Sequence, residues 1–311
     1  MAAVIKTVNL TKRYGTLVAL SNLNLEINEG DCFGFIGPNG AGKTTTIKIL
    51  ATLLQPTWGE ARICDLVVGY QSRQIRPLIG YVPDYFGAYE DMVVQEYLEF
   101  FAAAYNINGA KRTQIVNDVL ELTDLGYKKD AAVDGLSRGM KQRLSIARVL
   151  VHDPKVLLLD EPAGNLDPRA RIEMRELLKE LRRMGKTILI SSHILPELAD
   201  LCNTVGIIER GELIYSGPVA DIVKRARAGT VLHVGVSHNQ QLAAALLSQD
   251  PNVENVAANN GFLEVSLKDG VDDYTFVPQR LIQNGFKLTL LKEEEVNLET
   301  AFMRLTKGMV Q

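Results

Sequence analysis

An eight-residue run, Gly37-Pro-Asn-Gly-Ala-Gly-Lys-Thr44, limits the folds open to this chain more than anything else in its sequence. It follows a compact apolar segment, Cys32–Ile36, that we predict to be a β-strand, and it leads into a predicted helix from Gly42 to about Leu54. Glycines in such a turn let backbone N–H groups point inward at phosphate oxygens, and the positive end of the following helix points at the same anion. A plain glycine turn is the alternative, but the strand before and the helix after favour a phosphate-binding loop.

Two side chains at the end of this run predict which ligand the loop holds. Lys43 can reach the terminal phosphates of a nucleoside triphosphate, and Thr44 offers a hydroxyl to a bound Mg²⁺. The apolar strand Val156–Leu159 ends in two carboxylates, Asp160 and Glu161. We expect Asp160 on the Mg²⁺ side and Glu161 as the base that activates water. The alternative is a buried strand whose charges simply emerge into solvent.

Two further segments place polar residues where a ligand would lie. His193 comes just after the apolar strand Thr187–Ile190, and strand ends of this kind line the ligand crevice of parallel sheets. It is therefore a candidate to bind the γ-phosphate or the attacking water. The segment Leu136–Arg143 begins a predicted helix, with Ser137 as N-cap and Gly139 leaving room for an anion. Alone, this segment would be a capped surface helix, but the phosphate loop gives it a second interpretation.

The order of periodic segments predicts an α/β fold. The N-terminal part forms short β segments, of which Leu20–Ile27 alternates strictly between apolar and polar residues. Helical periodicity dominates from about residue 91 to 151, which indicates a helical insert. Apolar strands then return at Val156–Leu159, Thr187–Ile190 and Val205–Ile208. Their alternation with helices is typical of a parallel sheet covered by helices, so we expect a P-loop NTPase with an antiparallel N-terminal β part.

Beyond residue 225 the order of the elements changes. The predicted sequence is β-α-β-β-α-β, at Val231–Val236, Gln241–Leu247, Val253–Ala258, Phe262–Leu267, Phe276–Gln283 and Lys287–Leu291. This is the order of the ferredoxin-like split unit. We therefore expect an ATP-binding domain over residues 1–225 and a small α+β accessory domain over 226–311, which ends in a helix from about Leu298 to Leu305. This second domain shows no motif of reactive residues, which favours a regulatory or assembly role.

Composition argues against several other classes of protein. Hydrophobic residues make up 46% of the chain and charged residues 23%, an ordinary globular balance. The net charge of -3 gives no basic footprint, so no nucleic-acid partner is expected. The 3 cysteines lie far apart, which favours a reducing, cytoplasmic setting over a disulfide or zinc framework. Uninterrupted apolar runs are far shorter than the about 20 residues of a membrane-spanning helix, so we expect the chain not to cross a membrane by itself.

Taken together, these motifs resemble the nucleotide-binding subunits of ABC transporters, and the resemblance spans roughly residues 3–220. The run Gly37–Thr44 is similar to the Walker A loop of that family, Val156–Asp160 to Walker B and Leu136–Arg143 to the family signature. The signature is the most specific of the three, because other P-loop classes lack it. The resemblance implies that ATP is bound by Tyr14, Gly37, Pro38, Asn39, Gly40, Ala41, Gly42, Lys43, Thr44 and Thr45. It also implies catalytic roles for Glu161, His193 and Lys43, and Mg²⁺ ligands at Thr44, Asp160 and Asp84.

The same resemblance implies an assembly. In the family two subunits form a head-to-tail dimer, so the signature residues would contact the ATP held by the other copy; they are Ser137, Arg138, Gly139 and Met140. Asp167 matches the D-loop. The C-terminal part resembles the small domain of the type-2 exporter branch, whose members pair with separate permeases. The implied protein is a homodimeric ATPase, peripheral on the cytoplasmic face of the membrane, that powers export through an integral-membrane permease chain.

Several residues depart from the family pattern. The signature has Arg138 where the commonest form has glycine and Met140 where it often has glutamine. Asp84 replaces a glutamine that normally contacts Mg²⁺ and water. An aspartate still offers a hard oxygen ligand, but it is shorter and adds charge beside a triphosphate. The segment that follows, Tyr85–Met92, is rich in aromatic residues, and we expect it either to hold a permease helix or to pack under the helical insert.

Two other functions fit part of the sequence. An ABC-type ATPase that acts on nucleic acid or the ribosome would carry a coiled-coil insertion, a cysteine-rich zinc module or a second cassette, and the sequence shows none of these. A module that binds ATP and signals without turnover would fit the departures at Asp84 and Arg138. The presence of Lys43, Glu161 and His193 favours turnover, and transport remains the function that the sequence favours.

Overall fold

The computed structural model describes residues 3–85, 87, 91–192, 194–226, 230–259, 261–268, 270–271, 273–294, 298 and 302–303. The chain divides into two compact units, of which the first runs to Val219 and the second begins at Ala220. Each unit has its own hydrophobic core, so each is described by itself. Among the described residues, no helix combines the length and the apolar character needed to span a bilayer.

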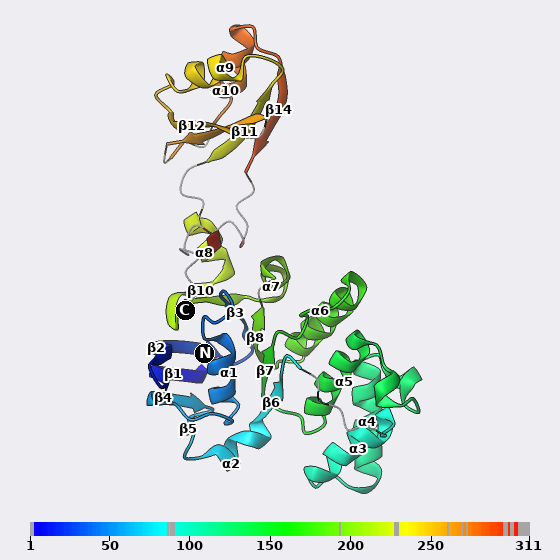
Figure 1. Cartoon of the computed structure of the whole chain (residues 1–311). Coiled ribbons are helices and arrows are strands. Elements are labelled where there is room, and N and C mark those ends of the chain that lie inside the picture. Colours follow the sequence, from blue (N-terminus) through cyan, green and yellow to red (C-terminus); the bar gives the residue numbers. More distant parts are fainter. Residues whose placement is uncertain are drawn as a thin grey trace. The chain divides into compact units, whose positions relative to one another are not determined.

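A four-stranded antiparallel sheet forms one layer of the first unit (Figure 1). Its strands pair in the order β2-β1-β4-β5, with bounds β1 (Ala3–Tyr14), β2 (Leu17–Asn28), β4 (Trp58–Ile63) and β5 (Leu66–Val67). The alternation predicted in β2 is confirmed, because Leu23, Leu25 and Ile27 are buried while the residues between them are exposed. One face of this sheet therefore belongs to the core and the other to solvent.

The central sheet has six strands in the order β10-β9-β3-β8-β7-β6. Their bounds are β3 (Cys32–Ile36), β6 (Ile79–Val82), β7 (Val156–Asp160), β8 (Thr187–Ser192), β9 (Thr204–Glu209) and β10 (Glu212–Pro218). Neighbouring strands from β9 to β6 pair in parallel, and only β10 is antiparallel, as the hairpin partner of β9. The predicted parallel core sheet is confirmed. Strands β3 and β7 are buried at every residue, which is why they read as continuous apolar runs.

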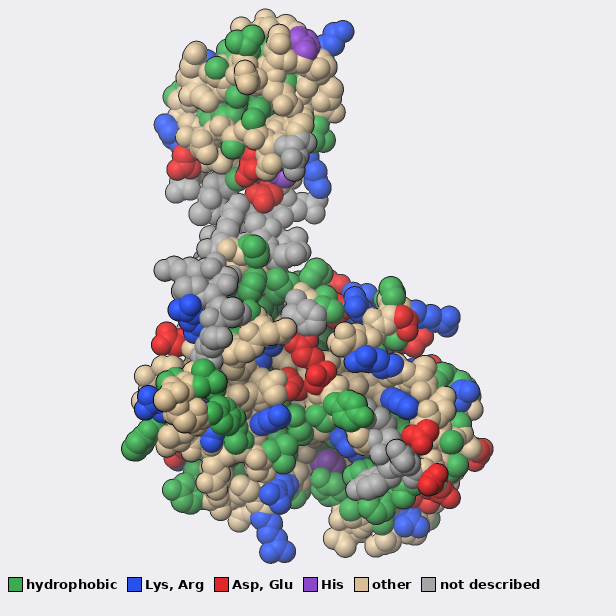
Figure 2. All heavy atoms as spheres, in the orientation of Figure 1, with side chains coloured by type: hydrophobic (Ala, Val, Ile, Leu, Met, Phe, Trp, Pro, Cys, Tyr) green, Lys and Arg blue, Asp and Glu red, His purple; other side chains and the backbone are tan. Residues whose placement is uncertain are grey.

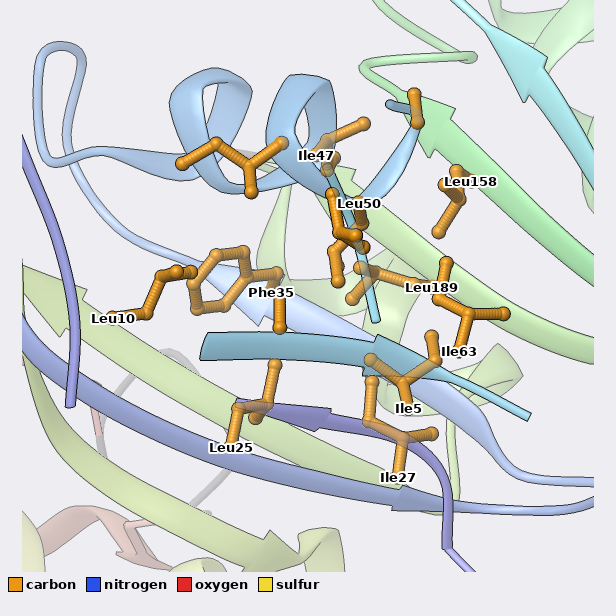
Figure 3. Packing of buried hydrophobic residues seen from close by; sticks show 14 of the residues in the cluster. Ile5, Leu10, Leu25, Ile27, Phe35, Ile47, Leu50, Ile63, Leu158 and Leu189 are labelled. Carbon is orange, nitrogen blue, oxygen red and sulfur yellow. The ribbon is translucent and has the colours of Figure 1, made fainter. Parts of the chain in front are cut away.

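Helix α1 (Lys43–Leu50) shares one hydrophobic cluster with both sheets. Figure 3 shows Ile47 and Leu50 of α1 above Phe35 of β3, with side chains of the antiparallel sheet closing the cluster from below. Burial of such large side chains is worth about 1.5–3 kcal/mol each. The packing therefore fixes the helix, and with it the loop that joins β3 to α1.

The predicted helical insert is present and lies beside β6, the outermost parallel strand (Figure 1). It consists of α3 (Val94–Ala104), α4 (Gly109–Leu122) and α5 (Arg138–Leu150), with single 3₁₀ turns at Gly126–Lys128 and Val133–Gly135. The remaining helices of this unit are α2 (Ser72–Ile75), a 3₁₀ turn at Arg76–Leu78, α6 (Pro168–Arg183) and α7 (Leu195–Leu201). On the face seen in Figure 2, basic and acidic side chains are interspersed over these elements.

The second unit begins within α8 (Val219–Ala226) and contains the predicted β-α-β-β-α-β order. Its elements are β11 (Val231–Val236), α9 (Gln240–Leu247), β12 (Val253–Asn259), β13 (Phe262–Leu267), α10 (Phe276–Gln283) and β14 (Leu288–Glu293). The strands form one antiparallel sheet in the order β12-β13-β11-β14, which confirms the ferredoxin-like prediction. The last predicted helix, about Leu298 to Leu305, falls largely outside the described residues.

Candidate nucleotide-binding site

The loop from Gly37 to Gly42 leaves the end of β3 and enters α1, as the sequence predicts. Gly37 and Gly42 are positions where only glycine fits, and a Cβ at Gly37 would lie 2.3 Å from the carbonyl oxygen of Ile208. Gly42 is constrained by its backbone as well. Its φ is 112°, and a Cβ there would lie 2.8 Å from the carbonyl oxygen of Ala19. The loop therefore turns into the start of α1 without a side chain in the way at this position. Within it the Ala41 N–H donates to the Pro38 carbonyl at 3.1 Å.

A pocket of about 220 Å³ lies over this loop. The residues that line it are Pro38, Asn39, Gly40, Ala41, Gly42, Lys43, Thr44, Thr45, Asp84 and Glu161. The structure thus brings together most of the predicted phosphate contacts with two of the predicted acidic residues. Gly37 lies just before them, at the end of β3.

Lys43 is buried at the bottom of this pocket. Its ammonium donates hydrogen bonds to the carbonyl oxygens of Gly37 (2.6 Å) and Pro38 (3.2 Å), and it lies 3.9 Å from Oε1 of Glu161. Burial lowers the pKa of Lys43, while the carboxylates of Glu161 and Asp160 act in the opposite direction. A desolvated cation of this kind is poised to pair with an anion that enters the pocket.

Asp160 ends β7 behind the loop and is buried. Its Oδ1 accepts hydrogen bonds from the hydroxyls of Thr44 (3.1 Å) and Ser191 (2.7 Å). Burial raises the pKa of Asp160, the two hydroxyl donors lower it, and the nearby carboxylates of Glu161 and Asp84 raise it again. Asp84 also helps, after burial and Asp160, to raise the pKa of the Tyr81 phenol to about 12.

These acidic residues give a test of whether Mg²⁺ fits here. The carboxylates of Glu161 and Asp84 both act on that of Asp160, whose Oδ1 accepts from the Thr44 hydroxyl. Among the described residues no three His, Cys, Asp or Glu side chains are grouped closely enough to hold a metal ion by themselves, so Mg²⁺ would enter here with the oxygens of a bound phosphate beside Asp160 and Thr44. Hard oxygen ligands are also those that Mg²⁺ prefers. The donor set therefore fits the metal.

Glu161, the residue after β7, has a left-handed backbone with φ 50°. Its N–H donates to two acceptors on Ser191, the hydroxyl at 3.0 Å and the carbonyl at 3.2 Å. Ser191 is fully buried on β8 and so links Asp160 to the unusual backbone of Glu161. Sequence reasoning did not single out Ser191. The signal that would have found it is the expected pairing of β7 with β8, which sets Asp160 opposite Ser191.

Other predicted residues lie elsewhere on the first unit. Tyr14, at the end of β1, is 47% exposed, and the Lys12 ammonium lies 5.2 Å from its ring centroid. Asp167 is the N-cap of α6, where its Oδ1 accepts from the Ala170 N–H at 3.0 Å. His193 is outside the described residues, as are Phe86 and Tyr89 of the predicted aromatic segment.

The predicted signature forms the first turn of α5. Ser137 is its N-cap, and its hydroxyl accepts from the Met140 N–H at 3.3 Å. Gly139 is buried against α6, and a Cβ there would lie 2.7 Å from the Cβ of Ala170. Within the part of the chain that the structure describes, none of the signature residues lines the phosphate pocket. Of the four, Ser137 and Arg138 are exposed, and these two are accessible to a group other than their own loop.

The parallel strands place the loop, the lysine and the carboxylates together at the carboxyl ends of the strands of the central sheet. That is the arrangement of a P-loop protein, which binds a nucleoside triphosphate.

Comparison with known proteins narrows this class to a family. A family model described as "ABC transporter" matches residues 20–164. The chain is 39% identical over 223 residues to the Nod factor export ATP-binding protein I of Cupriavidus metallidurans, covering 72% of this chain and 74% of the relative. It is 34% identical over 310 residues to the bacitracin transport ATP-binding protein BcrA of Bacillus licheniformis, covering 99% of each.

Solved structures agree with these relatives. An ATP-binding subunit of an ABC transporter superposes with a TM-score of 0.65 at 27% identity, over 71% of this chain and 92% of that one. A dimeric bacterial ABC transporter cassette superposes with a TM-score of 0.62 at 29% identity, over 69% of this chain and 98% of that one. This chain belongs to the ABC transporter family. It is an ATP-binding subunit of the type-2 exporter kind, and it hydrolyses ATP.

Proposed function

We propose that this chain drives export by hydrolysing Mg·ATP while it is bound, as a pair of copies, to a separate integral-membrane permease. The observation that carries the proposal is the meeting of Lys43 and Thr44 with Asp160 and Glu161 at one edge of the sheet. Export is favoured by the relatives, one of which is a Nod factor export protein and another a bacitracin transport protein. The place of action is then the cytoplasmic face of the membrane.

The residues on the metal side have distinct roles in this proposal. Thr44, Asp160 and Asp84 would hold Mg²⁺, which when bound supplies charge neutralisation at the phosphate oxygens. Asp160 is kept in place by the hydroxyls of Thr44 and Ser191, so its carboxylate has little freedom to turn. Asp84 adds a negative charge to this side that a glutamine would not add.

Lys43 and Glu161 act on the triphosphate and on water. Lys43 exchanges the carbonyl oxygens of Gly37 and Pro38 for phosphate oxygens, which are charged and so better acceptors. Glu161 takes a proton from the attacking water, and Ser191 holds the backbone from which that carboxylate extends. His193 is proposed as the residue that contacts the γ-phosphate, and Tyr14 as the ring that stacks on adenine.

The signature turn completes the site of the other copy. Ser137, Arg138, Gly139 and Met140 would face the γ-phosphate held by the partner, with Asp167 at the same junction. The dimeric cassette among the similar structures supports this arrangement. Two identical composite sites then form in a closed two-fold dimer.

The two predicted domains have different proposed functions. Residues 1–225 form the ATPase, and residues 226–311 form an accessory domain with a regulatory or assembly role. The core and sheet of the second unit support a domain that folds on its own packing.

Replacing Glu161 with glutamine tests the proposal. Glu161→Gln keeps the shape of the side chain but removes its basicity, so ATP binding should persist while steady-state hydrolysis falls by about a hundredfold or more. The measurement is ATP turnover beside nucleotide binding, with the wild-type chain and with exposed Glu254→Gln as a matched control. A Glu161→Gln chain that turns over ATP at a near-normal rate contradicts the assignment.

A further inference from the structure

Strand β6 is the outer edge of the central sheet, and its outward carbonyl oxygens have side-chain donors. The Leu78 carbonyl accepts from the Lys155 N–H beside β7, so it points into the sheet. Backbone carbonyls alternate in direction along a strand, so the carbonyls of Ile79 and Tyr81, one and three residues further on, both point away from β7. His152 Nε2 donates to the Ile79 carbonyl at 2.9 Å, and Arg148 donates to the Tyr81 carbonyl at 3.4 Å.

The two donors come from one short segment. Arg148 is in the last turn of α5, and His152 lies in the turn that follows the end of the helix at Leu150. The two carbonyls are two residues apart, which is about 6.6 Å along a strand. One short segment therefore holds β6 at two points. We call Arg148 and His152 the β6 clamp.

Aromatic rings hold both donors in place. The Tyr105 ring stacks on the His152 imidazole with centroids 4.0 Å apart and planes 6° apart. The Arg148 guanidinium lies 5.4 Å from the centroid of the Phe101 ring, within range of a cation–π interaction. A carbonyl can only accept, so His152 Nε2 carries the proton in this bond. Burial lowers the pKa of His152, which favours the neutral ring.

The strand that the clamp holds leads directly to the phosphate pocket. Val82 ends β6, and Asp84 lies two residues further on, where it lines the pocket with Glu161 and acts on the carboxyl of Asp160. The position of Asp84 is thus set by the strand before it. An edge strand has neighbours on one side only, so its outer side needs other partners to stay in place.

We propose that Arg148 and His152 are positioning residues that, through β6, hold Asp84 at the metal side of the phosphate pocket. The proposal rests on the metal role of Asp84 given above. Neither clamp residue lines the pocket. The proposal nevertheless predicts that loss of the clamp raises the Mg²⁺ concentration needed for turnover while ATP binding stays nearly unchanged.

The experiment measures ATP turnover by the full chain against Mg²⁺ concentration at saturating ATP, together with equilibrium binding of ATP to the same variants, which should not change. His152→Ala should raise the Mg²⁺ concentration at half-maximal rate by about fivefold, the effect of losing one ordinary hydrogen bond. His152→Gln, whose amide can donate to the same carbonyl, should restore most of the response. His238→Ala removes a histidine of the second unit and should change nothing. Arg148→Met replaces His152→Ala if thermal unfolding shows that the latter does not fold.

A double-mutant cycle with Asp84→Asn decides the mechanism. Asp84→Asn alone should shift the Mg²⁺ response, and adding His152→Ala should then shift it little further, because both act on one carboxylate. The clamp proposal is wrong if the fold-changes that the two substitutions cause in the half-maximal Mg²⁺ concentration multiply in the double mutant. It is also wrong if Asp84→Asn has an effect and His152→Ala alone has none. In both cases the metal role of Asp84 stands. If Asp84→Asn has no effect, both proposals are wrong.

Discussion

Helices α1 and α5 each begin at a glycine-containing turn, yet the two turns have different surroundings. At α1, Lys43 is buried 3.9 Å from Glu161, and the pocket over the loop is lined by residues of the same chain. At α5, Ser137 and Arg138 are exposed, and the Arg138 side chain makes no ion pair or hydrogen bond with a described residue. The first turn holds a cation, a hydroxyl and carboxylates, whereas the second offers donors alone. In the proposed function, one chain would therefore carry most of one phosphate site and part of the site of the other copy.

The strongest test of this difference is the loss of the buried cation. Lys43→Ala should weaken ATP binding by the single chain about a hundredfold, because a charge-assisted contact to the terminal phosphates is lost in a desolvated pocket. Lys48→Ala, an exposed lysine on the same helix, is the matched control. Nucleotide binding to the isolated chain is the measurement. If substitutions in the α5 turn weaken ATP binding by the isolated chain as much as Lys43→Ala does, the two turns do not differ in the way described.

The second test changes the α5 turn alone. Ser137→Ala should leave ATP binding by the single chain intact but lower turnover by roughly thirtyfold and prevent the ATP-driven dimer of the Glu161→Gln chain. Sedimentation with and without Mg·ATP, with the permease present, measures the dimer.

A control separates contact with the partner's phosphate from helix capping. Ser137→Asp keeps a good N-cap but brings a negative charge toward phosphate. It should therefore fail as Ser137→Ala does. Recovery of the dimer by Ser137→Asp would show that the serine serves only its own helix.

A smaller effect is expected behind the α1 turn, at Ser191. Ser191→Ala should lower kcat about tenfold with little change in KM, because the Glu161 N–H loses the hydroxyl that is one of its two acceptors and Asp160 loses one of its two donors. Thr187→Val on the same strand is the control, since it removes a buried hydroxyl that accepts from the Gly30 N–H far from the pocket. Steady-state kinetics, measured together with thermal unfolding, separates an effect on catalysis from a loss of stability. Similar kcat losses in both variants would make Ser191 a purely structural residue.

The smallest effect should come from Tyr14, which lies apart from both turns. Tyr14→Ala should raise the KM for ATP about fivefold, the scale of one stacking contact with a base, and Tyr14→Phe should leave it unchanged. Comparing ATP with GTP in both variants is a second readout. A Tyr14→Phe chain as impaired as Tyr14→Ala would point to the hydroxyl and away from stacking.

Much of the fold was predictable because local patterns and tertiary packing agree. The strands Val231–Val236 and Phe262–Leu267 have the predicted bounds. The first is a mostly apolar and mostly buried run, and in the second every other residue is buried. Strand β4 was not predicted. Of its six residues only Ala61 and Ile63 are buried, and a glycine and two charged residues interrupt the pattern. Its pairing with β1, a tertiary contact, defines it as a strand.

In the candidate site, too, some residues could be predicted from local sequence and one could not. Lys43, Thr44, Asp160 and Glu161 follow from motifs whose spacing is local, and the structure brings them together. Ser191 could not be found locally, because its partner lies 31 residues away on a neighbouring strand. Register between parallel strands, which no single segment specifies, creates that contact.

The support of the phosphate loop has a consequence for synthesis of the chain. The Ala41 carbonyl accepts from the Gly211 N–H at 2.9 Å, and the Gly211 carbonyl accepts from the Ser21 N–H at 2.9 Å. The loop is thus held by a turn that is made roughly 170 residues later. At ribosomal speeds of about 5–20 residues per second, this is a delay of roughly 10 to 30 s. The phosphate-loop sequence of a nascent chain is therefore made long before its supporting turn, and we expect the loop to be held for nucleotide only once the chain extends past Gly211, about two thirds of its 311 residues.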